Sequence, residues 1–245
     1  MPAGNRFSAT RPAIKTSGGS VDPAVLKKAP LFANLDDEAA TALSEAMGTI
    51  KLNKGEILFH EGDAEDRLYV VISGKIKLGR SGSAGRENLL AILGPGQMFG
   101  ELSLFDPGPR SATVTAVTDA AFASLSHEDL LRWLEGRPVV ARGLLTQLAG
   151  RLRKANDVVA DLVFSDVPGR VAKALLDLAE RFGRTADDGV HVHHDLTQEE
   201  LAQLVGASRE TVNKALADFA SRGWLRLEPR SVVIMDVDRL RRRAR

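Results

Sequence analysis

A carboxylate, a guanidinium and a hydroxyl lie close together in one short segment, residues 99–113. Glu101 follows a glycine, and Arg110 and Ser111 follow a loop that contains two prolines. A guanidinium can bind a phosphate through two parallel hydrogen bonds, and a serine hydroxyl beside it adds another donor. Because Glu101 would repel a phosphate, we expect it to accept a hydrogen bond from a neighbouring sugar hydroxyl. This set suits a phosphorylated sugar; the alternative is a Glu–Arg ion pair that steadies the loop.

A second group of residues follows the spacing of a helix–turn–helix, over residues 197–216. Thr197 and Glu200 form a capping box at the start of the first helix. Gly206 suits the tight turn between the helices, and Ser208 can cap the second one. Apolar residues recur at helical spacing on the inward faces of both helices: Leu201, Leu204, Val212, Leu216 and Phe219.

The outward face of the second helix carries Arg209, Glu210, Asn213 and Lys214. Arginine and lysine suit the O6 and N7 atoms of guanine, and glutamate can accept from N4 of cytosine. Other polar residues nearby, including Arg230, are positioned to contact phosphates. The alternative is a plain helical hairpin with a charged face. The predicted DNA contacts are Thr197, Gln198, Ser208, Arg209, Glu210, Thr211, Asn213, Lys214 and Arg230.

Short strands punctuated by glycine must position the first group of residues. Such strands at regular spacing indicate an antiparallel barrel or sandwich. Two further strands, 224–227 and 231–235, predict a two-stranded wing beside the helix–turn–helix. The strands predicted for the barrel or sandwich lie within residues 56–63, 67–80, 87–100 and 111–125.

A long helix is predicted over residues 138–164, between the two groups. Its heptad spacing keeps one apolar stripe facing a partner helix. Because no neighbouring helix of comparable length is predicted in this chain, we favour a two-fold dimer over one helix of a monomeric bundle. Residues 165–170 then form a hinge. The apolar residues recur at intervals of 3, 4, 3, 4 and 3: Leu145, Leu148, Leu152, Ala155, Val159 and Leu162.

The composition narrows the function classes. The chain has 245 residues, no cysteine and a formal net charge of +1. This length favours two domains. Because the net charge is close to zero, it does not indicate a nucleic-acid partner, and evidence for one must come from the local arrangement of charged residues. Absence of cysteine excludes disulfides and Cys-ligated metals. Residues 1–21 lack the apolar core of a signal peptide and are predicted to be a disordered tail. No apolar run is long enough to span a bilayer, so we expect a cytoplasmic protein.

Several reactive side chains receive no functional assignment. His191 and His193 would share one face of a strand and His194 the other, so a surface strand is preferred to a metal site. No nucleophile, base and orienting group occur as a set, and we therefore expect no enzyme.

Segment 99–113 resembles the phosphate-binding cassette of cyclic-nucleotide-binding domains in the cAMP receptor protein branch of the CRP/FNR regulators. The run Ser208–Val212 resembles the catabolite activator branch of the same family, and the resemblance covers about residues 31–234. It implies that Glu101 binds the ribose 2′-hydroxyl. It also implies that the cyclic phosphate binds Arg110 and Ser111, with backbone contacts from Gly100 and Leu102.

In that family the dimer helix contacts adenine, typically through an adjacent pair of hydroxyls. Alignment puts Ala155 and Asn156 at these positions. Ala155 departs from the pattern because it cannot hydrogen-bond the base, whereas Asn156 can donate and accept across the dimer. The resemblance thus implies cAMP with weaker or altered base discrimination. It also implies that Arg209, Glu210 and Lys214 read a TGTGA-like half-site, with the lysine relaxing one base position because the family usually has arginine there.

We therefore predict an α+β protein: an N-terminal cyclic-nucleotide-binding β-jelly roll (22–137), a long dimerisation helix with its hinge (138–165) and a C-terminal winged helix–turn–helix (166–245). The expected function is a cAMP-responsive homodimeric transcription regulator on palindromic double-stranded DNA, with RNA polymerase as a further partner and no membrane. Two alternatives stay open. One is a regulator of the same fold that is constitutive or responds to another effector. The other is a cyclic-nucleotide-dependent enzyme subunit.

Overall fold

The computed structural model describes the chain except residues 1–15, 18–20, 30, 31, 34, 83–86, 103–107, 136 and 245. Most of the predicted tail therefore lies outside the described residues. Its described part is not irregular throughout: Thr16–Ser17 form strand β1, which pairs with Ile50 and Thr49.

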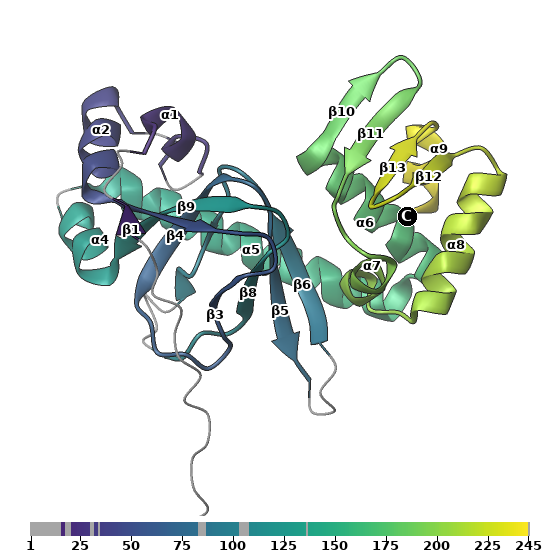
Figure 1. Cartoon of the computed structure of the whole chain (residues 1–245), viewed down its shortest axis with the longest axis horizontal. Coiled ribbons are helices and arrows are strands. Elements are labelled where there is room, and N and C mark those ends of the chain that lie inside the picture. Colours follow the sequence, from purple (N-terminus) through teal and green to yellow (C-terminus); the bar gives the residue numbers. More distant parts are fainter. Residues whose placement is uncertain are drawn as a thin grey trace, which may run out of the picture.

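Within the described residues, two antiparallel sheets form the N-terminal β-roll (Figure 1). One has the strand order β1-β2-β9-β4-β7 and the other β3-β8-β5-β6. This arrangement confirms the predicted jelly roll. The strands after β1 are β2 (Gly48–Leu52), β3 (Ile57–Phe59), β4 (Arg67–Ser73), β5 (Ile76–Ser81), β6 (Glu87–Leu93), β7 (Met98–Phe99), β8 (Thr113–Ala116) and β9 (Ala120–Ser126).

An aromatic cluster fills the space between the two sheets. Tyr69 and Phe99 stack with their ring centroids 5.1 Å apart, and Phe122 meets Phe99 edge-on at 5.7 Å. Phe59 from the other sheet lies 5.9 Å from Tyr69. Rings of this size contribute much of the apolar area that the roll buries. They also form the floor beneath Arg110.

Three short helices close one end of the β-roll: α1 (Pro23–Leu26), α2 (Asp37–Ala46) and α4 (His127–Leu134). The Asp36 side chain accepts from the amide of Ala39, and Ser126 accepts from the amide of Asp129. Both N-caps satisfy amides that a helix start leaves without partners.

Helix α5 (Pro138–Phe164) has the predicted bounds. Its 27 residues correspond to roughly 40 Å, and in Figure 1 it runs behind the β-roll toward the second half of the molecule. Helix α6 (Val167–Phe182) follows after Asp166, whose side chain caps it by accepting from Gly169. A single capped break therefore separates the two helices.

The C-terminal part contains the predicted helix–turn–helix, α7 (Gln198–Val205) and α8 (Arg209–Ser221), followed by α9 (Val237–Arg243). The wing is wider than expected. Its strands β12 (Leu225–Glu228) and β13 (Ser231–Ile234) belong to a sheet of order β10-β11-β13-β12, completed by β10 (Gly183–Ala186) and β11 (Gly189–His193). Pairing of β11 with β13 joins segments about 40 residues apart, which local pattern does not reveal.

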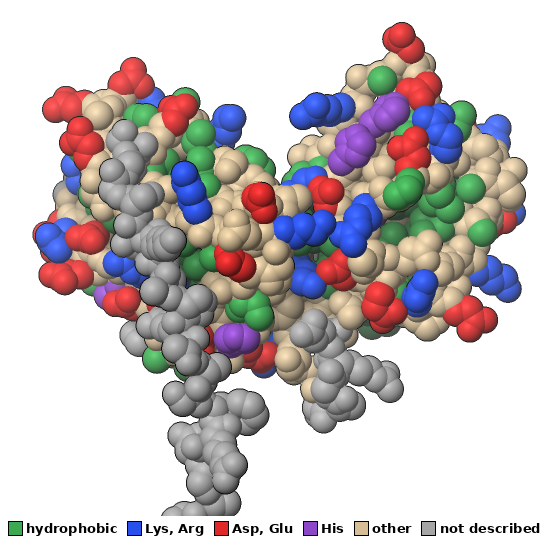
Figure 2. All heavy atoms as spheres, viewed as in Figure 1, with side chains coloured by type: hydrophobic (Ala, Val, Ile, Leu, Met, Phe, Trp, Pro, Cys, Tyr) green, Lys and Arg blue, Asp and Glu red, His purple; other side chains and the backbone are tan. Residues whose placement is uncertain are grey.

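The two halves share an interface. Leu89 and Ile92 of β6 belong to the same apolar cluster as the core of the winged domain. Around them, Lys77 Nζ lies 2.7 Å from the Glu200 carboxylate, and Lys75 Nζ lies 2.5 Å from that of Asp195. Figure 2 shows basic and acidic side chains next to one another where the two lobes meet.

Candidate ligand site and nucleic-acid interface

Arg110 is almost completely buried, with 3% of its surface exposed. Its guanidinium donates from Nη1 to the carbonyl of Gly100 (3.0 Å) and from Nη2 to the carbonyl of Arg67 (2.7 Å). The Phe59 ring centroid lies 4.3 Å from Cζ. A buried cation requires such compensation, because transfer out of water is otherwise strongly unfavourable. The roll thus holds a desolvated positive charge.

A second acidic residue, Glu65, lies against this guanidinium. Its Oε2 is 3.4 Å from Arg110 Nη2, and the Glu65 side chain is 8% exposed. Tyr69 donates its hydroxyl to Oε1 at 2.7 Å. Burial and the neighbouring Glu65 carboxylate raise the pKa of Tyr69, so this hydroxyl remains a donor. Sequence reasoning missed Glu65, because 45 residues separate it from Arg110 and no local motif links them.

Gly100 allows the close approach. Its φ is +82°, and a Cβ at this position would lie 2.7 Å from both Arg110 Nη1 and the Arg67 carbonyl oxygen. Only glycine tolerates both this backbone conformation and this contact. The absence of a side chain at Gly100 therefore leaves room for the Arg110 guanidinium against this stretch of backbone.

The other cassette residues divide between buried and exposed positions. Glu101, directly after Gly100, is 1% exposed. Leu102 is 54% exposed and Ser111 is also exposed. The rest of the loop, residues 103–107, lies outside the described part of the chain. A buried carboxylate and a buried guanidinium are thus brought to one region, with the serine at its surface.

Helix α5 presents apolar side chains to solvent. Leu145, Leu152, Val159 and Leu162 of the predicted stripe are between 53% and 68% exposed. Leu148, by contrast, is partly buried against the helical cluster of the β-roll. Ala155 and Asn156, the residues that the family resemblance assigned to the base, are both exposed on this helix.

The helix–turn–helix has the predicted local geometry. Both halves of the capping box form: Thr197 accepts from the Glu200 amide, and Glu200 accepts from the Thr197 amide. Gly206 ends α7 in the left-handed conformation, with φ +69°. Ser208 caps α8 by accepting from the Thr211 amide at 3.2 Å. The predicted inward residues are buried or partly buried: Leu201, Leu204, Val212, Leu216 and Phe219.

The outward face of α8 is open at Arg209, Glu210 and Lys214, all exposed. Asn213 differs from the expectation, because it is half-buried and its Oδ1 is enclosed. It therefore faces partly toward the protein.

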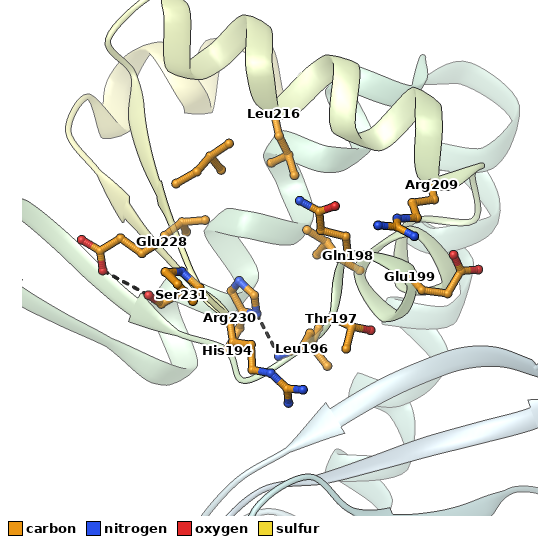
Figure 3. A pocket seen from close by; sticks show the side chains of 14 residues that line it. His194, Leu196, Thr197, Gln198, Glu199, Arg209, Leu216, Glu228, Arg230 and Ser231 are labelled. Carbon is orange, nitrogen blue, oxygen red and sulfur yellow. Dashed lines mark hydrogen bonds between the residues drawn. The ribbon is translucent and has the colours of Figure 1, made fainter.

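A groove of about 400 Å³ separates the start of α7, the start of α8 and the wing (Figure 3). Thr197, Gln198, Arg209 and Arg230 all line it. Arg230 has φ +56°, and its carbonyl accepts from the amide of Asp195, whose φ is +62°. This backbone link joins the turn of the wing to the segment that enters α7. The structure thus places four predicted DNA-contacting residues around one groove.

At neutral pH, His194 at this groove is uncharged, whereas Asp188 in the β10–β11 turn carries its charge. Burial lowers the pKa of His194 to about 4, so it is neutral at pH 7 and accepts from the Leu196 amide at 3.0 Å. Hydrogen bonds from His191 and Arg226 lower the pKa of Asp188 to about 2. Within the described residues, no group of three or more His, Cys, Asp or Glu side chains could hold a metal ion.

A jelly roll with a buried arginine, joined by one long helix to a winged helix–turn–helix, defines a ligand-sensing regulator that binds DNA. Known proteins place the chain within this class. Residues 49–137 match the cyclic nucleotide-binding domain, and residues 169–243 match the Crp-like helix-turn-helix domain. The chain belongs to the CRP/FNR family of transcription regulators.

Individual relatives support this assignment. A CRP-like cAMP-activated global transcriptional regulator of Mycobacterium tuberculosis is 54% identical over 221 residues, covering 90% of this chain and 99% of that protein. The crystal structure of the Thermus thermophilus catabolite activator protein is 38% identical with a TM-score of 0.52, over 88% of this chain and 98% of that one. The c-di-GMP responsive global regulator CLP of Xanthomonas campestris is 26% identical with a TM-score of 0.69, over 81% and 99%. In the described residues, no helix combines the length and apolarity needed to cross a membrane.

Proposed function

We propose that this chain is a cAMP-responsive transcription regulator that binds palindromic DNA as a homodimer in the cytoplasm. One observation carries the proposal: the β-roll buries Arg110 beside Gly100 and Glu101, while the same chain exposes Arg209 on a recognition helix. A buried guanidinium suits a phosphate and a buried carboxylate suits a ribose hydroxyl. The Mycobacterium tuberculosis relative is named for activation by cAMP, which favours this nucleotide.

In this proposal each cassette residue has a defined part. Arg110 and Ser111 bind the cyclic phosphate, and Glu101 accepts from the ribose 2′-hydroxyl. The backbone at Gly100 and Leu102 lies alongside the sugar and phosphate.

Asn156 of α5 reaches the adenine from across the dimer, while Ala155 offers no hydrogen bond there. We therefore expect weaker discrimination between cAMP and cGMP than a hydroxyl side chain at 155 would give.

The exposed stripe of α5 is the proposed dimer surface. An apolar stripe more than half exposed over several turns is unfavourable in water, and pairing with a second copy would cover it. Leu152→Glu would place a charge in the middle of the stripe and should yield a monomer by sedimentation equilibrium. Leu131→Glu is the control, because Leu131 is 44% exposed on α4 and lies off the stripe. A dimer that persists in the Leu152 variant would contradict this arrangement.

The proposed mechanism is a population shift between two placements of the winged domains. Nucleotide bound by Arg110 and Asn156 favours one packing of the paired α5 helices. The break at Ser165–Asp166 then sets the two α8 helices about one DNA turn apart, roughly 34 Å, as helix–turn–helix dimers require. RNA polymerase is the proposed protein partner, and no enzymatic activity is proposed.

The decisive experiment is DNA binding with and without nucleotide. Calorimetry with cAMP and cGMP measures nucleotide affinity, and fluorescence anisotropy on a palindromic duplex measures DNA affinity. Affinity for DNA should rise when cAMP is added. Equal DNA affinity in both conditions would contradict the gated mechanism.

Ala155 favours one second candidate, a regulator of the same fold that is constitutive or responds to another effector. The c-di-GMP responsive regulator of Xanthomonas campestris shares the fold, so the architecture alone does not determine the effector. Calorimetry with c-di-GMP beside cAMP separates the two candidates.

A further inference from the structure

Glu65 occupies the guanidinium that the proposed function assigns to the phosphate. The ion pair between Glu65 Oε2 and Arg110 Nη2 spans 3.4 Å, with the side chains 8% and 2% exposed. Nη2 also donates to the Arg67 carbonyl at 2.7 Å. This nitrogen therefore already has a neutral and a charged acceptor from the protein.

A bound phosphate and the Glu65 carboxylate would compete for the same cation. Both are anions, and repulsion between like charges is strong where water is excluded. A phosphate that reaches Arg110 therefore either displaces Glu65 or remains next to a buried negative charge. Displacement is the arrangement of lower energy, because Glu65 can regain water outside the roll.

The loop around Glu65 permits that displacement. Residues 60–66 join β3 to β4 without regular structure. The first part of the loop is tied down, since Arg110 donates its amide to the Asp63 carbonyl at 2.9 Å. Both neighbours of Glu65, Ala64 and Asp66, are exposed. A rotation of the Glu65 side chain would thus carry its carboxylate to solvent, and neither sequence neighbour would have to leave a buried position.

We propose that Glu65 is an affinity-determining residue, an internal competitor that holds Arg110 until the cyclic phosphate replaces its carboxylate. This inference rests on the proposed function, because it assumes that Arg110 binds the phosphate. Tyr69 has a supporting part: its hydroxyl orients Glu65 toward Arg110 through the 2.7 Å hydrogen bond.

Glu65→Gln tests the inference because it removes the charge and keeps the shape. Calorimetry with cAMP on the full chain should give a dissociation constant about tenfold lower than in the unmodified protein. Asp66→Asn is the matched control: it removes one charge from the same loop at an exposed position, and it should leave the constant unchanged. Equal or weaker cAMP binding by Glu65→Gln would overturn the inference.

Thermal unfolding supplies a second readout. Without nucleotide, Glu65→Gln should melt at a lower temperature than the unmodified protein, because Arg110 loses its charged partner. Added cAMP should raise the melting temperature of the variant by more than that of the unmodified protein. Should Glu65→Gln fold poorly, Glu65→Asp keeps the charge but draws it back from Arg110, and a gain in cAMP affinity is still expected. Equal upshifts in variant and unmodified protein would contradict competition.

The Arg110→Gln background separates competition from a general effect on the pocket. There, Glu65→Gln should no longer improve cAMP affinity, because both effects act through one guanidinium. An improvement that persists in that background overturns the inference. cAMP binding by the unmodified protein separates failure of this inference from failure of the proposed function. If the unmodified protein binds cAMP but the Glu65 variant gains no affinity, only the competing role of Glu65 is contradicted. If neither protein binds cAMP, the proposed function fails as well.

Discussion

Arg110 and Arg209 are both assigned to nucleotide-containing ligands, but the chain places them in opposite surroundings. Arg110 is 3% exposed, and its guanidinium is held by two carbonyls, an aromatic ring and a carboxylate. Arg209 is exposed at the start of α8, beside an open groove. A buried cation has a fixed direction and is little screened by salt, whereas an exposed one is mobile and strongly screened. The first suits recognition of one small anion, and the second suits reading a long polyanion.

The strongest test of this contrast is Arg110→Gln. Loss of the buried guanidinium should weaken cAMP binding by about 100-fold or more, because a charge-assisted contact in a water-excluded site is lost. Calorimetry measures the change. Arg80→Gln is the control, since Arg80 is exposed on the same roll and pairs with Glu61. Unchanged cAMP affinity in Arg110→Gln would show that the cassette assignment is incorrect.

Gly100→Ala tests whether the buried site depends on the backbone beneath it. The new Cβ would meet Arg110 Nη1 and the Arg67 carbonyl at 2.7 Å, with φ at +82°. We expect a loss of about 2–4 kcal/mol in the free energy of unfolding. Gly62→Ala is the matched control: φ is +90°, but nothing lies within 4 Å of the added Cβ, so conformational strain alone should cost about 1 kcal/mol. Chemical denaturation compares them, and equal losses would refute the steric argument.

Arg209→Ala examines the exposed side of the comparison. Loss of a base contact should reduce the preference for a TGTGA-like duplex over a scrambled one by about 1–3 kcal/mol. Calorimetry should give an unchanged cAMP affinity. Arg222→Ala at the far end of α8 is the control, because Arg222 pairs with Asp218 away from the groove. An unchanged ratio between the affinities for the TGTGA-like duplex and the scrambled duplex would argue against base reading by Arg209.

The smallest expected effect concerns Glu200, which lies between the two regions. Burial raises the pKa of Glu200, but hydrogen bonds from Lys77 and Thr197 outweigh burial, and the folded pKa lies below the ordinary 4.5. The stabilisation is therefore present at neutral pH and is lost as the pH falls through the folded pKa. Glu200→Gln keeps a residue suited to the capping box but removes the charge. It should unfold more easily by less than about 1 kcal/mol at pH 7.

The effect of Glu200→Gln should shrink as the pH falls, because protonation of Glu200 removes its charge in the unmodified protein and the variant carries no charge there at any pH. Glu199→Gln, exposed on the same turn, is the control and should change stability little at any pH. A Glu200 effect of constant size from pH 7 to pH 3 would rule out the ion pair as its source.

The sequence pattern predicted the structural features that depend on residues close together in the chain. The bounds of α5, the capping box of α7 and the turn at Gly206 each depend on a few neighbouring residues, and all three were predicted correctly. Strand spacing predicted an antiparallel barrel or sandwich, and the resemblance to the CRP/FNR family specified the jelly roll.

The missing features all join distant parts of the chain. Glu65 meets Arg110 across 45 residues, Lys77 meets Glu200 across 123, and β11 pairs with β13. Periodicity and caps carry no information about which distant strand or charge will be adjacent. Asn213 is a subtler case: helical spacing put it outward, but packing encloses its Oδ1.

Leu89 and Ile92 belong to the β-roll in sequence but lie in the apolar cluster of the winged domain. A fragment that begins at residue 166 would therefore expose to solvent the apolar surface that β6 covers in the full chain. Such a fragment should aggregate or bind other apolar surfaces non-specifically, and its thermal unfolding transition should broaden. The β-roll and the winged domain are consequently poor candidates for exchange between proteins as independent units. A chimera that exchanges the winged domain must also exchange the β5–β6 hairpin.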